Sequence, residues 1–291
     1  MKFRELHSRG CEKLNRAGIE EAELDSRLLL LDAFSLTTAE YLLCQNKDIY
    51  ASDPLAEERR IKYENNIMER ALRRPLQYIL SSTEFMGLDM RCEEGVLIPR
   101  QDTETLCEEV LDNNKNPELK IIDMCTGSGC IASALSYYGS YKNITAADIS
   151  DKAMKVAEIN LKKYAKNGFR LVKSDLFDVF KDNSGQPLES FDIIVSNPPY
   201  IKTSVIEELE PEVREYEPKL ALDGDQDGLV FYRRISSEAV KFLSPGGRIY
   251  YEIGHDQGAE LRMILEELGY SNIKISKDLC GLDRVVSASF Y

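Results

Sequence analysis

One short stretch constrains this chain more than any other: the apolar run 191–195, Phe-Asp-Ile-Ile-Val, followed directly by Ser-Asn-Pro-Pro-Tyr. The run is short and rich in β-branched residues, which is typical of a buried parallel strand. The two prolines cannot donate backbone N–H groups, so the hydrogen-bond ladder has to stop at them. A stiff, extended turn is therefore expected at the carboxyl end of a strand, where open α/β sheets bind their ligands.

The groups on this turn suit a planar –NH2 group. The side-chain oxygen of Asn197 and the carbonyl of Pro198 can accept its two hydrogens, while the ring of Tyr200 can stack on its plane. A proline-terminated core strand without any binding role fits the same residues equally well. The rest of the chain has to decide between the two interpretations.

Charge restricts the class of partner. The 291 residues carry a formal net charge of −13, and nearly all of the acidic excess lies after residue 80. A duplex-DNA binder needs basic side chains to neutralise phosphates, so this balance argues against direct nucleic-acid binding. A basic protein partner is compatible with it, as is a merely solvated acidic surface.

Cysteine usage restricts the compartment and the metal chemistry. The seven cysteines are scattered without a C-x-x-C pair, and the chain has two histidines, which argues against a zinc site and against a disulfide scaffold. We find no signal peptide and no apolar run of membrane-spanning length. These features predict a reduced, cytoplasmic protein with neither metal nor membrane association.

The first third of the chain predicts two small parts. Residues 1–75 are expected to form an N-terminal helical domain, which can serve in substrate docking. Its last helix should begin at Asp53-Pro54 and bury a stripe of Ile61, Met68 and Leu72. Residues 76–98 are expected to form a β-hairpin linker with its turn at Glu94-Gly95.

Residues 99–291 alternate between strand and helix patterns, which predicts a doubly wound, mostly parallel sheet of the Rossmann-like α/β class. Asp102 or Thr103 is expected to cap the first helix. Two closing strands without a helix between them predict an antiparallel edge strand. The expected strands are 120–124, 144–148, 170–173, 191–195, 248–253, 272–276 and 284–290.

A glycine-rich turn predicts a nucleotide-like cofactor. Gly127-x-Gly129 follows a strand and opens a helix, and Asp148 ends the next strand, where it can accept from both hydroxyls of a ribose. With Ala132 the pattern is also G-x-G-x-x-A, so NAD(P) stays open as an alternative.

Two acidic residues favour S-adenosylmethionine over NAD(P). Asp123 can reach the ammonium group of the methionine, and Asp175 can accept from adenine N6. Each is also compatible with a capped or solvated loop. Cys125, which has no basic neighbour in the sequence, is expected to pack or to show its backbone to the ligand rather than to react.

The Asn-Pro-Pro-Tyr turn resembles that of methyltransferases acting on a planar nitrogen, which include adenine-N6 and glutamine-N5 enzymes. Further stretches in the same order resemble the HemK/PrmC family, which modifies class I peptide-chain release factors. These stretches are 74–79 with 84–85 and 87–88, 97–100 with Thr103-Glu104, 216–218 with 221–222, 227–229 and 232–233, 252–254 with Gln257, and 278–279 with 283–286.

The resemblance implies a class I methyltransferase fold over residues 99–291. It also implies that a methyl group passes from S-adenosylmethionine, leaving S-adenosylhomocysteine, to the N5 amide nitrogen of the glutamine in the Gly-Gly-Gln motif of class I release factors. By resemblance the cofactor site takes Cys125, Thr126, Gly127, Ser128, Gly129, Asp148, Leu176 and Asn197, to which the residue arguments above add Asp123 and Asp175. The substrate glutamine takes Asn197, Pro198, Pro199 and Tyr200, with Asn197, Pro198 and Tyr200 as the catalytic set.

Two positions depart from the family pattern. Cys125 stands where the family usually has glycine, which should narrow the loop, and Asp223-Gly224-Asp225 replaces a commoner Gly-Gly. Four alternatives remain at this stage. They are a glutamine-N5 methyltransferase acting on a ribosomal protein, an adenine-N6 nucleic-acid methyltransferase, an NAD(P) oxidoreductase, and a non-catalytic module that binds release factors.

Overall fold

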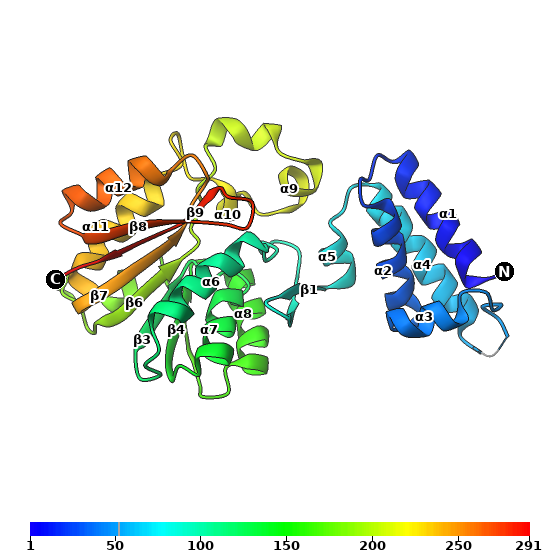
Figure 1. Ribbon diagram of the computed structural model, residues 1–291, viewed down its shortest axis with the longest axis horizontal. Coiled ribbons are helices and arrows are strands. Elements are labelled where there is room, and N and C mark those ends of the chain that lie inside the picture. Colours follow the sequence, from blue (N-terminus) through cyan, green and yellow to red (C-terminus); the bar gives the residue numbers. More distant parts are fainter. Residues whose placement is uncertain (52) are drawn as a thin grey trace. The chain divides into compact units, whose positions relative to one another are not determined.

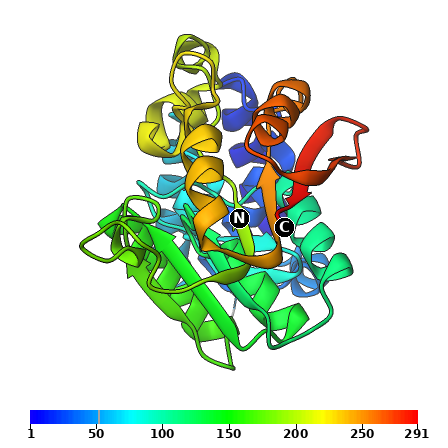
Figure 2. The ribbon, with the colours of Figure 1, turned by 90° about the vertical axis from the view of Figure 1, so that its left-hand side faces the viewer.

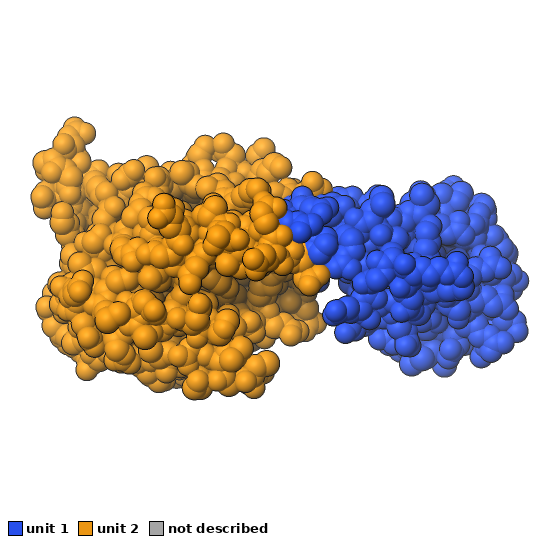
Figure 3. Space-filling model, turned by 90° about the horizontal axis from the view of Figure 1, so that it is seen from above, with its two compact units in different colours: residues 1–81, 211–216 blue, residues 82–210, 217–291 orange. Residues whose placement is uncertain are grey.

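The computed structural model describes residues 1–51 and 53–291. These residues form two compact units, of which the first combines residues 1–81 with residues 211–216. The second combines residues 82–210 with residues 217–291 (Figure 3). A segment far along the chain therefore belongs to the helical unit, which no local sequence pattern indicated.

The first unit is helical, as the sequence predicted. The helices of its first 81 residues are α1 (Phe3–Arg16), α2 (Ala22–Phe34), α3 (Thr38–Cys44), α4 (Ala56–Ala71) and α5 (Leu76–Leu80), and the late segment adds α9 (Pro211–Tyr216) (Figure 1). The hydroxyl of the buried Tyr63 lies 2.8 Å from the hydroxyl of Ser26, which links α4 to α2 inside the core.

Two expectations about α4 are wrong. The helix begins at Ala56 rather than at Pro54, because Asp53 accepts a hydrogen bond from the backbone N–H of Leu55 in a turn before the helix. The predicted stripe of Ile61, Met68 and Leu72 is exposed, and α4 instead buries Ala56, Tyr63, Ile67 and Arg70. Periodicity alone did not identify this face, since two of its members are an alanine and an arginine.

The hairpin exists, but its turn lies elsewhere. Strands β1 (Ser82–Phe85) and β2 (Leu88–Arg91) pair antiparallel around Met86 and Gly87, whose φ angles are 50° and 71°. Two central residues with positive φ make the tight turn that matches strand twist. Residues 76–80 are helical and residues 96–98 form no strand in the described chain. A turn does lie at the predicted Glu94-Gly95, where the backbone N–H of Val96 donates to the carbonyl of Glu93 at 3.2 Å, but it is not the turn of the hairpin.

The second unit is built on a seven-stranded sheet in the described part of the chain, in the order β5-β4-β3-β6-β7-β9-β8. Strands β3 to β7 pair in parallel, and β9 is antiparallel to both of its neighbours. The predicted mostly parallel sheet with antiparallel pairing at one edge is confirmed. The strands are β3 (Lys120–Met124), β4 (Asn143–Asp148), β5 (Arg170–Lys173), β6 (Phe191–Ser196), β7 (Leu243–Glu252), β8 (Ser271–Lys277) and β9 (Asp283–Ser289).

Helices cover both faces of this sheet (Figures 1 and 2). Side chains alternate along a strand, so Ile193 faces one hydrophobic core and Ile194 faces the other. The first core lies under α6 (Asp102–Asn113), α7 (Cys130–Gly139) and α8 (Asp151–Tyr164). The second lies under α11 (Val230–Phe242) and α12 (Gly258–Glu267).

Short elements fill the connections. They are two 3₁₀ turns, η1 (Asp178–Phe180) and η2 (Thr203–Glu208), and α10 (Lys219–Leu222). None of the helices in the described residues is long and apolar enough to cross a membrane.

The first testable prediction concerns a buried ion cluster in the helical unit. The side chain of Arg70 is 10% exposed and lies 2.6 Å from Asp25 and 2.9 Å from Glu212. Arg70→Met keeps the apolar stem but leaves Asp25 buried without its cation. We therefore expect the free energy of unfolding of this unit to fall by about 3–5 kcal/mol.

Urea unfolding followed by circular dichroism measures the change. Arg16 pairs with Glu12 on the surface of α1, so Arg16→Ala is the control and should shift the free energy by about 0–1 kcal/mol. Equal shifts for the two variants would contradict the importance of the buried cluster.

Candidate active site

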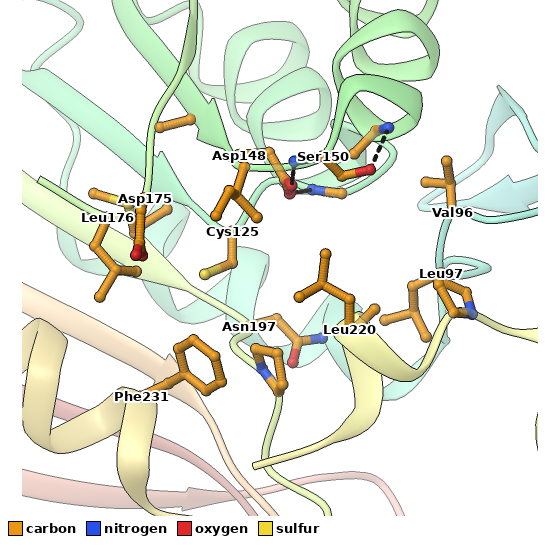
Figure 4. A pocket seen from close by; sticks show the side chains of 18 of the residues that line it. Val96, Leu97, Cys125, Asp148, Ser150, Asp175, Leu176, Asn197, Leu220 and Phe231 are labelled. Atoms are coloured by element: carbon orange, nitrogen blue, oxygen red, sulfur yellow. Dashed lines mark hydrogen bonds between the residues drawn. The ribbon is translucent and has the colours of Figure 1, made fainter. Parts of the chain in front are cut away.

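A pocket of about 720 Å³, its open mouth included, lies where β3, β4 and β6 end (Figure 4). The sequence-predicted residues that line it are Cys125, Gly127, Asp148, Asp175, Leu176, Asn197 and Pro199. Most of the remaining lining is apolar and was missed, including Val96, Leu97, Leu220 and Phe231. These residues come from stretches whose patterns carry no binding signal of their own.

The carboxylate of Asp148 ties the glycine loop to the end of β4. Its two oxygens accept from the backbone N–H groups of Gly127 and Ser150, each at 2.8 Å (Figure 4). Burial raises the pKa of Asp148 above its usual value, and these backbone donors act in the opposite direction. Each oxygen keeps a lone pair, so the carboxylate can still accept from a ligand.

The close approach of loop and helix requires glycine at position 129. Its φ is 75°, and a Cβ atom there would lie 3.0 Å from Cα of Ala157 in α8. Three of the predicted cofactor residues are part of this loop but do not belong to the described lining of the pocket. They are Thr126, Ser128 and Gly129.

Asp123 holds the loop from beneath. It is fully buried, and its Oδ2 accepts from the hydroxyl of Thr126 at 2.5 Å and from the backbone N–H of Ala132 at 3.1 Å. Burial raises its pKa to about 7, although both donors oppose that shift. Asp123 is outside the described lining of the pocket, and its Oδ1 is buried without a hydrogen-bond partner among the described residues, so its contact with an ammonium group stays a prediction.

Part of the pocket lining combines one acidic side chain with apolar ones. Asp175 accepts from the guanidinium of Arg234 at 2.9 Å, and both side chains are part-exposed. Leu176 and Phe231 lie on the same side of the pocket (Figure 4). This part of the lining suits a flat, largely apolar ligand group that carries a hydrogen-bond donor at its edge.

Cys125 occupies a conformation that favours glycine. Its φ is 62°, in the left-handed region, and its side chain points into the pocket (Figure 4). Burial raises the pKa of the thiol well above its usual value, with the nearby Asp148 acting in the same direction. A protonated thiol is a poor nucleophile, which agrees with a packing role.

The Asn-Pro-Pro-Tyr turn follows β6 at the pocket. The amide nitrogen of Asn197 donates to the hydroxyl of Thr103 at 3.3 Å, and the hydroxyl of Tyr200 donates to Oε1 of Glu252 at 3.3 Å. Asn197 and Pro199 line the pocket, while Pro198 and Tyr200 are outside its described lining. The turn is therefore anchored through side chains at both of its ends.

Residues behind the turn hold the backbone of Tyr200 in place, and the sequence did not identify them as part of the site. Its carbonyl accepts from the side-chain amide of Gln257 at 3.0 Å. A Cβ atom on Gly224 would lie 2.8 Å from Cα of Tyr200, and one on Gly228 would lie 2.4 Å from its carbonyl oxygen. The stretch Asp223-Gly224-Asp225 departs from the family pattern, and within it position 224 sterically requires glycine.

Metal ligation has no support in the described residues. Their His, Cys, Asp and Glu side chains form no group of three that could hold a metal ion. The polar side chains that line the pocket carry two carboxylates, one amide, one thiol and two hydroxyls, and the other side chains of the lining are apolar.

The second testable prediction uses the strained position of Cys125. Both Cys125→Gly and Cys125→Ala remove the sulfur, but only glycine adopts a positive φ without a steric penalty. We expect the glycine variant to be more stable than the alanine variant by about 1 kcal/mol. Thermal unfolding of the two proteins side by side measures the difference, and an alanine variant of equal or greater stability would contradict the strain.

Comparison with known proteins agrees with this geometry. Residues 5–80 match the model of the PrmC N-terminal domain, and residues 101–210 match that of the methyltransferase small domain. A release factor glutamine methyltransferase of Clostridium botulinum is 38% identical over 100% of both chains. Another, of Clostridium acetobutylicum, is 39% identical over 99% of this chain and 98% of its own.

A solved structure supports the fold. A methyltransferase from Pyrococcus furiosus matches 81% of this chain and 98% of its own with a TM-score of 0.50 and 20% identity. The likeness at this identity concerns the fold, whereas the two full-length relatives define the family. This chain therefore belongs to the release factor glutamine methyltransferase family, PrmC/HemK.

Proposed function

We propose that this protein transfers a methyl group from S-adenosylmethionine to the side-chain N5 of the glutamine in the Gly-Gly-Gln motif of class I peptide-chain release factors. The observation that carries the proposal is the Asn197 amide, which lies in the pocket at the carboxyl end of the central strand β6. The names of the full-length relatives support the choice of release factors as the substrate.

The residues of the pocket fit S-adenosylmethionine in two respects. The carboxylate of Asp148 has lone pairs left to accept from the ribose hydroxyls, and the side chains of Leu176 and Phe231 offer apolar surface to the adenine ring. Asp175 is the candidate acceptor for adenine N6. When bound, this cofactor supplies an electrophilic methyl group, and S-adenosylhomocysteine is the product that leaves.

The protein has to make an amide nitrogen reactive without a general base. The nitrogen shares its lone pair with the carbonyl, and its proton is too weakly acidic for a carboxylate to remove. The side-chain oxygen of Asn197 and the carbonyl of Pro198 can accept its two hydrogens, and these bonds strengthen as the nitrogen gains positive charge. After the methyl group has passed to the nitrogen, the nitrogen releases one proton to water. Tyr200 provides a ring on which the amide plane can stack.

The test is mass spectrometry of a full-length class I release factor after incubation with the protein and S-adenosylmethionine. We expect the mass of one added methyl group, located by fragmentation on the glutamine of Gly-Gly-Gln. A factor with that glutamine replaced should gain nothing. Ribosomal proteins and an adenine-containing oligonucleotide, offered in parallel, test the two rival substrates, and preferential methylation of either would overturn the proposal.

The third testable prediction concerns the cofactor. Asp148→Ala should weaken the binding of S-adenosylmethionine by about 1–3 kcal/mol, the loss expected for a hydrogen bond to a charged group. Asp151 lies close by on α8 with its side chain 75% exposed, so Asp151→Ala is the control and should bind normally. Calorimetry on both variants measures the affinities. Unchanged affinity of a folded Asp148 variant would remove this residue from the site, and tight binding of NADH would overturn the choice of cofactor.

The fourth testable prediction concerns the amide acceptor. Asn197→Ala keeps the strand and both prolines, but it removes the oxygen aimed at the substrate –NH2 group. We expect the methylation rate to fall by about 10²–10³, the typical cost of one preorganised polar contact, while cofactor affinity changes much less.

The carboxylate variant sharpens this test. Asn197→Asp keeps an acceptor and should retain part of the activity if acceptance alone matters. A rate close to that of the unmodified protein for Asn197→Ala would refute the proposed role of this residue.

A further inference from the structure

The Asn197 side chain has one neighbour that the sequence assigned to a different task. Asp102 or Thr103 was expected to cap α6, but the helix begins at Asp102, its N-cap residue is Gln101, and Thr103 lies inside it. Its side chain is almost fully buried, and its hydroxyl oxygen accepts from Nδ2 of Asn197 at 3.3 Å. The hydroxyl therefore faces the substrate turn rather than the helix terminus.

A buried carboxylate stands behind this hydroxyl. Glu252, at the end of β7, is 1% exposed, and its Oε1 accepts a hydrogen bond from the hydroxyl of Tyr200 at 3.3 Å. The hydroxyl of Thr103 acts on the same carboxylate and lowers its pKa, against the effect of burial. The Oε2 atom of Glu252 has no hydrogen-bond partner among the described residues, so the group retains capacity to accept. Tyr200 at one end of the turn thus bonds directly to Glu252, and Asn197 at the other end bonds to Thr103, whose hydroxyl acts on the same carboxylate.

The chemistry of these groups fixes the direction of each bond. An ionised carboxylate can only accept, so its charge turns the hydrogen of the Thr103 hydroxyl toward it. The lone pairs of that hydroxyl are then left to accept from the –NH2 end of Asn197. The oxygen of Asn197 remains free on the other side of the amide, where it can accept from a substrate.

We propose that Thr103 and Glu252 are positioning residues that hold the Asn197 amide with its oxygen toward the substrate. This inference rests on the proposed function, because it concerns the same amide acceptor. It adds that the orientation of the amide is set from within the protein before any substrate arrives. An amide free to rotate by half a turn would present hydrogens to a substrate –NH2 group and repel it.

The charge of Glu252 makes the arrangement sensitive to pH. Burial raises its pKa to about 7, and a protonated Glu252 could donate to Thr103, which would release the hydroxyl hydrogen toward Asn197. Turnover should therefore fall as the pH drops below about 7. The titratable and charged groups that act on Glu252 or feel its charge are Tyr200 on the turn, Asp102 and Cys107 on α6, Cys130 on α7, Tyr232 on α11 and Arg284 on β9.

The fifth testable prediction compares two substitutions of Thr103. Thr103→Val keeps the shape and removes the hydroxyl, and it should lower the single-turnover methylation rate by about 10²-fold, the cost of a misplaced reacting group. Thr103→Ser keeps the hydroxyl and should restore most of the rate. Cofactor affinity should stay unchanged in both variants, because Thr103 is outside the described lining of the pocket.

Thr145 is a buried threonine of β4 and provides the matched control. Thr145→Val should leave the rate unaltered, which separates loss of the Thr103 hydroxyl from loss of any buried hydroxyl. Glu252→Gln should be slow at pH 8 and should lose the fall in rate below pH 7. A Thr103→Val enzyme as fast as the unmodified protein, or a Glu252→Gln enzyme with an unmodified rate and pH profile, would overturn the proposal while leaving the proposed function intact.

A readout without turnover separates this inference from the proposed function. The side-chain –NH2 signals of Asn197 in ¹⁵N-labelled protein can be assigned by their loss in Asn197→Asp. They should shift in Thr103→Val and stay in place in Thr103→Ser. Signals that do not move in Thr103→Val overturn the positioning role even if the release factor proves not to be the substrate.

Discussion

Parallel pairing of three neighbouring strands is the constraint on which the site depends. Met124 of β3 lies opposite Ala147 of β4 on one side and opposite Ser196 of β6 on the other. The residues that follow these positions are Cys125, Asp148 and Asn197, and all three line the pocket. A slip of one residue in either pairing would turn the corresponding side chain to the other face of the sheet. The hydrophobic burial that fixes the register therefore also assembles the site.

Two buried carboxyl groups support the site from opposite sides. Asp123 lies under the glycine loop and Glu252 lies behind the Asn-Pro-Pro-Tyr turn, and burial raises the pKa of each to about 7. Folding favours their protonated forms. Each group therefore contributes less to the free energy of unfolding as the pH rises from the pKa that the group has in the unfolded chain toward 7. A protein selected for stability alone would place apolar residues there. Their presence is explained by the backbone and hydroxyl groups that they hold in place.

Features that depend on the conformational preferences of single residues could be predicted from the sequence, whereas contacts between distant residues could not. Proline and glycine have strong conformational preferences, so the turn at Asn197 and the loop at Gly127 could be placed from the sequence. Thr103 was one of two candidates for a helix cap because capping is a local property, whereas its side-chain partner Asn197 is 94 residues away. Phe231 contributes to the pocket from an ordinary amphipathic helix, and nothing near it in the sequence marks that role. The pattern at Asp123 predicted a ligand contact, but it could not show that this carboxylate also binds Thr126 and Ala132 of the loop and helix that follow.

The helical unit is discontinuous in sequence, and this limits its modularity. Arg70 and Arg73 both bind Glu212, which the chain supplies 139 residues or more beyond them. A fragment ending at residue 81 would carry these two arginines without that carboxylate. A chimaera that exchanged the first 81 residues between two family members would join arginines from one parent to a glutamate segment from the other. Recombination within the family is therefore expected to be tolerated when residues 1–81 and residues 211–216 come from the same parent. The two stretches should be inherited as one unit.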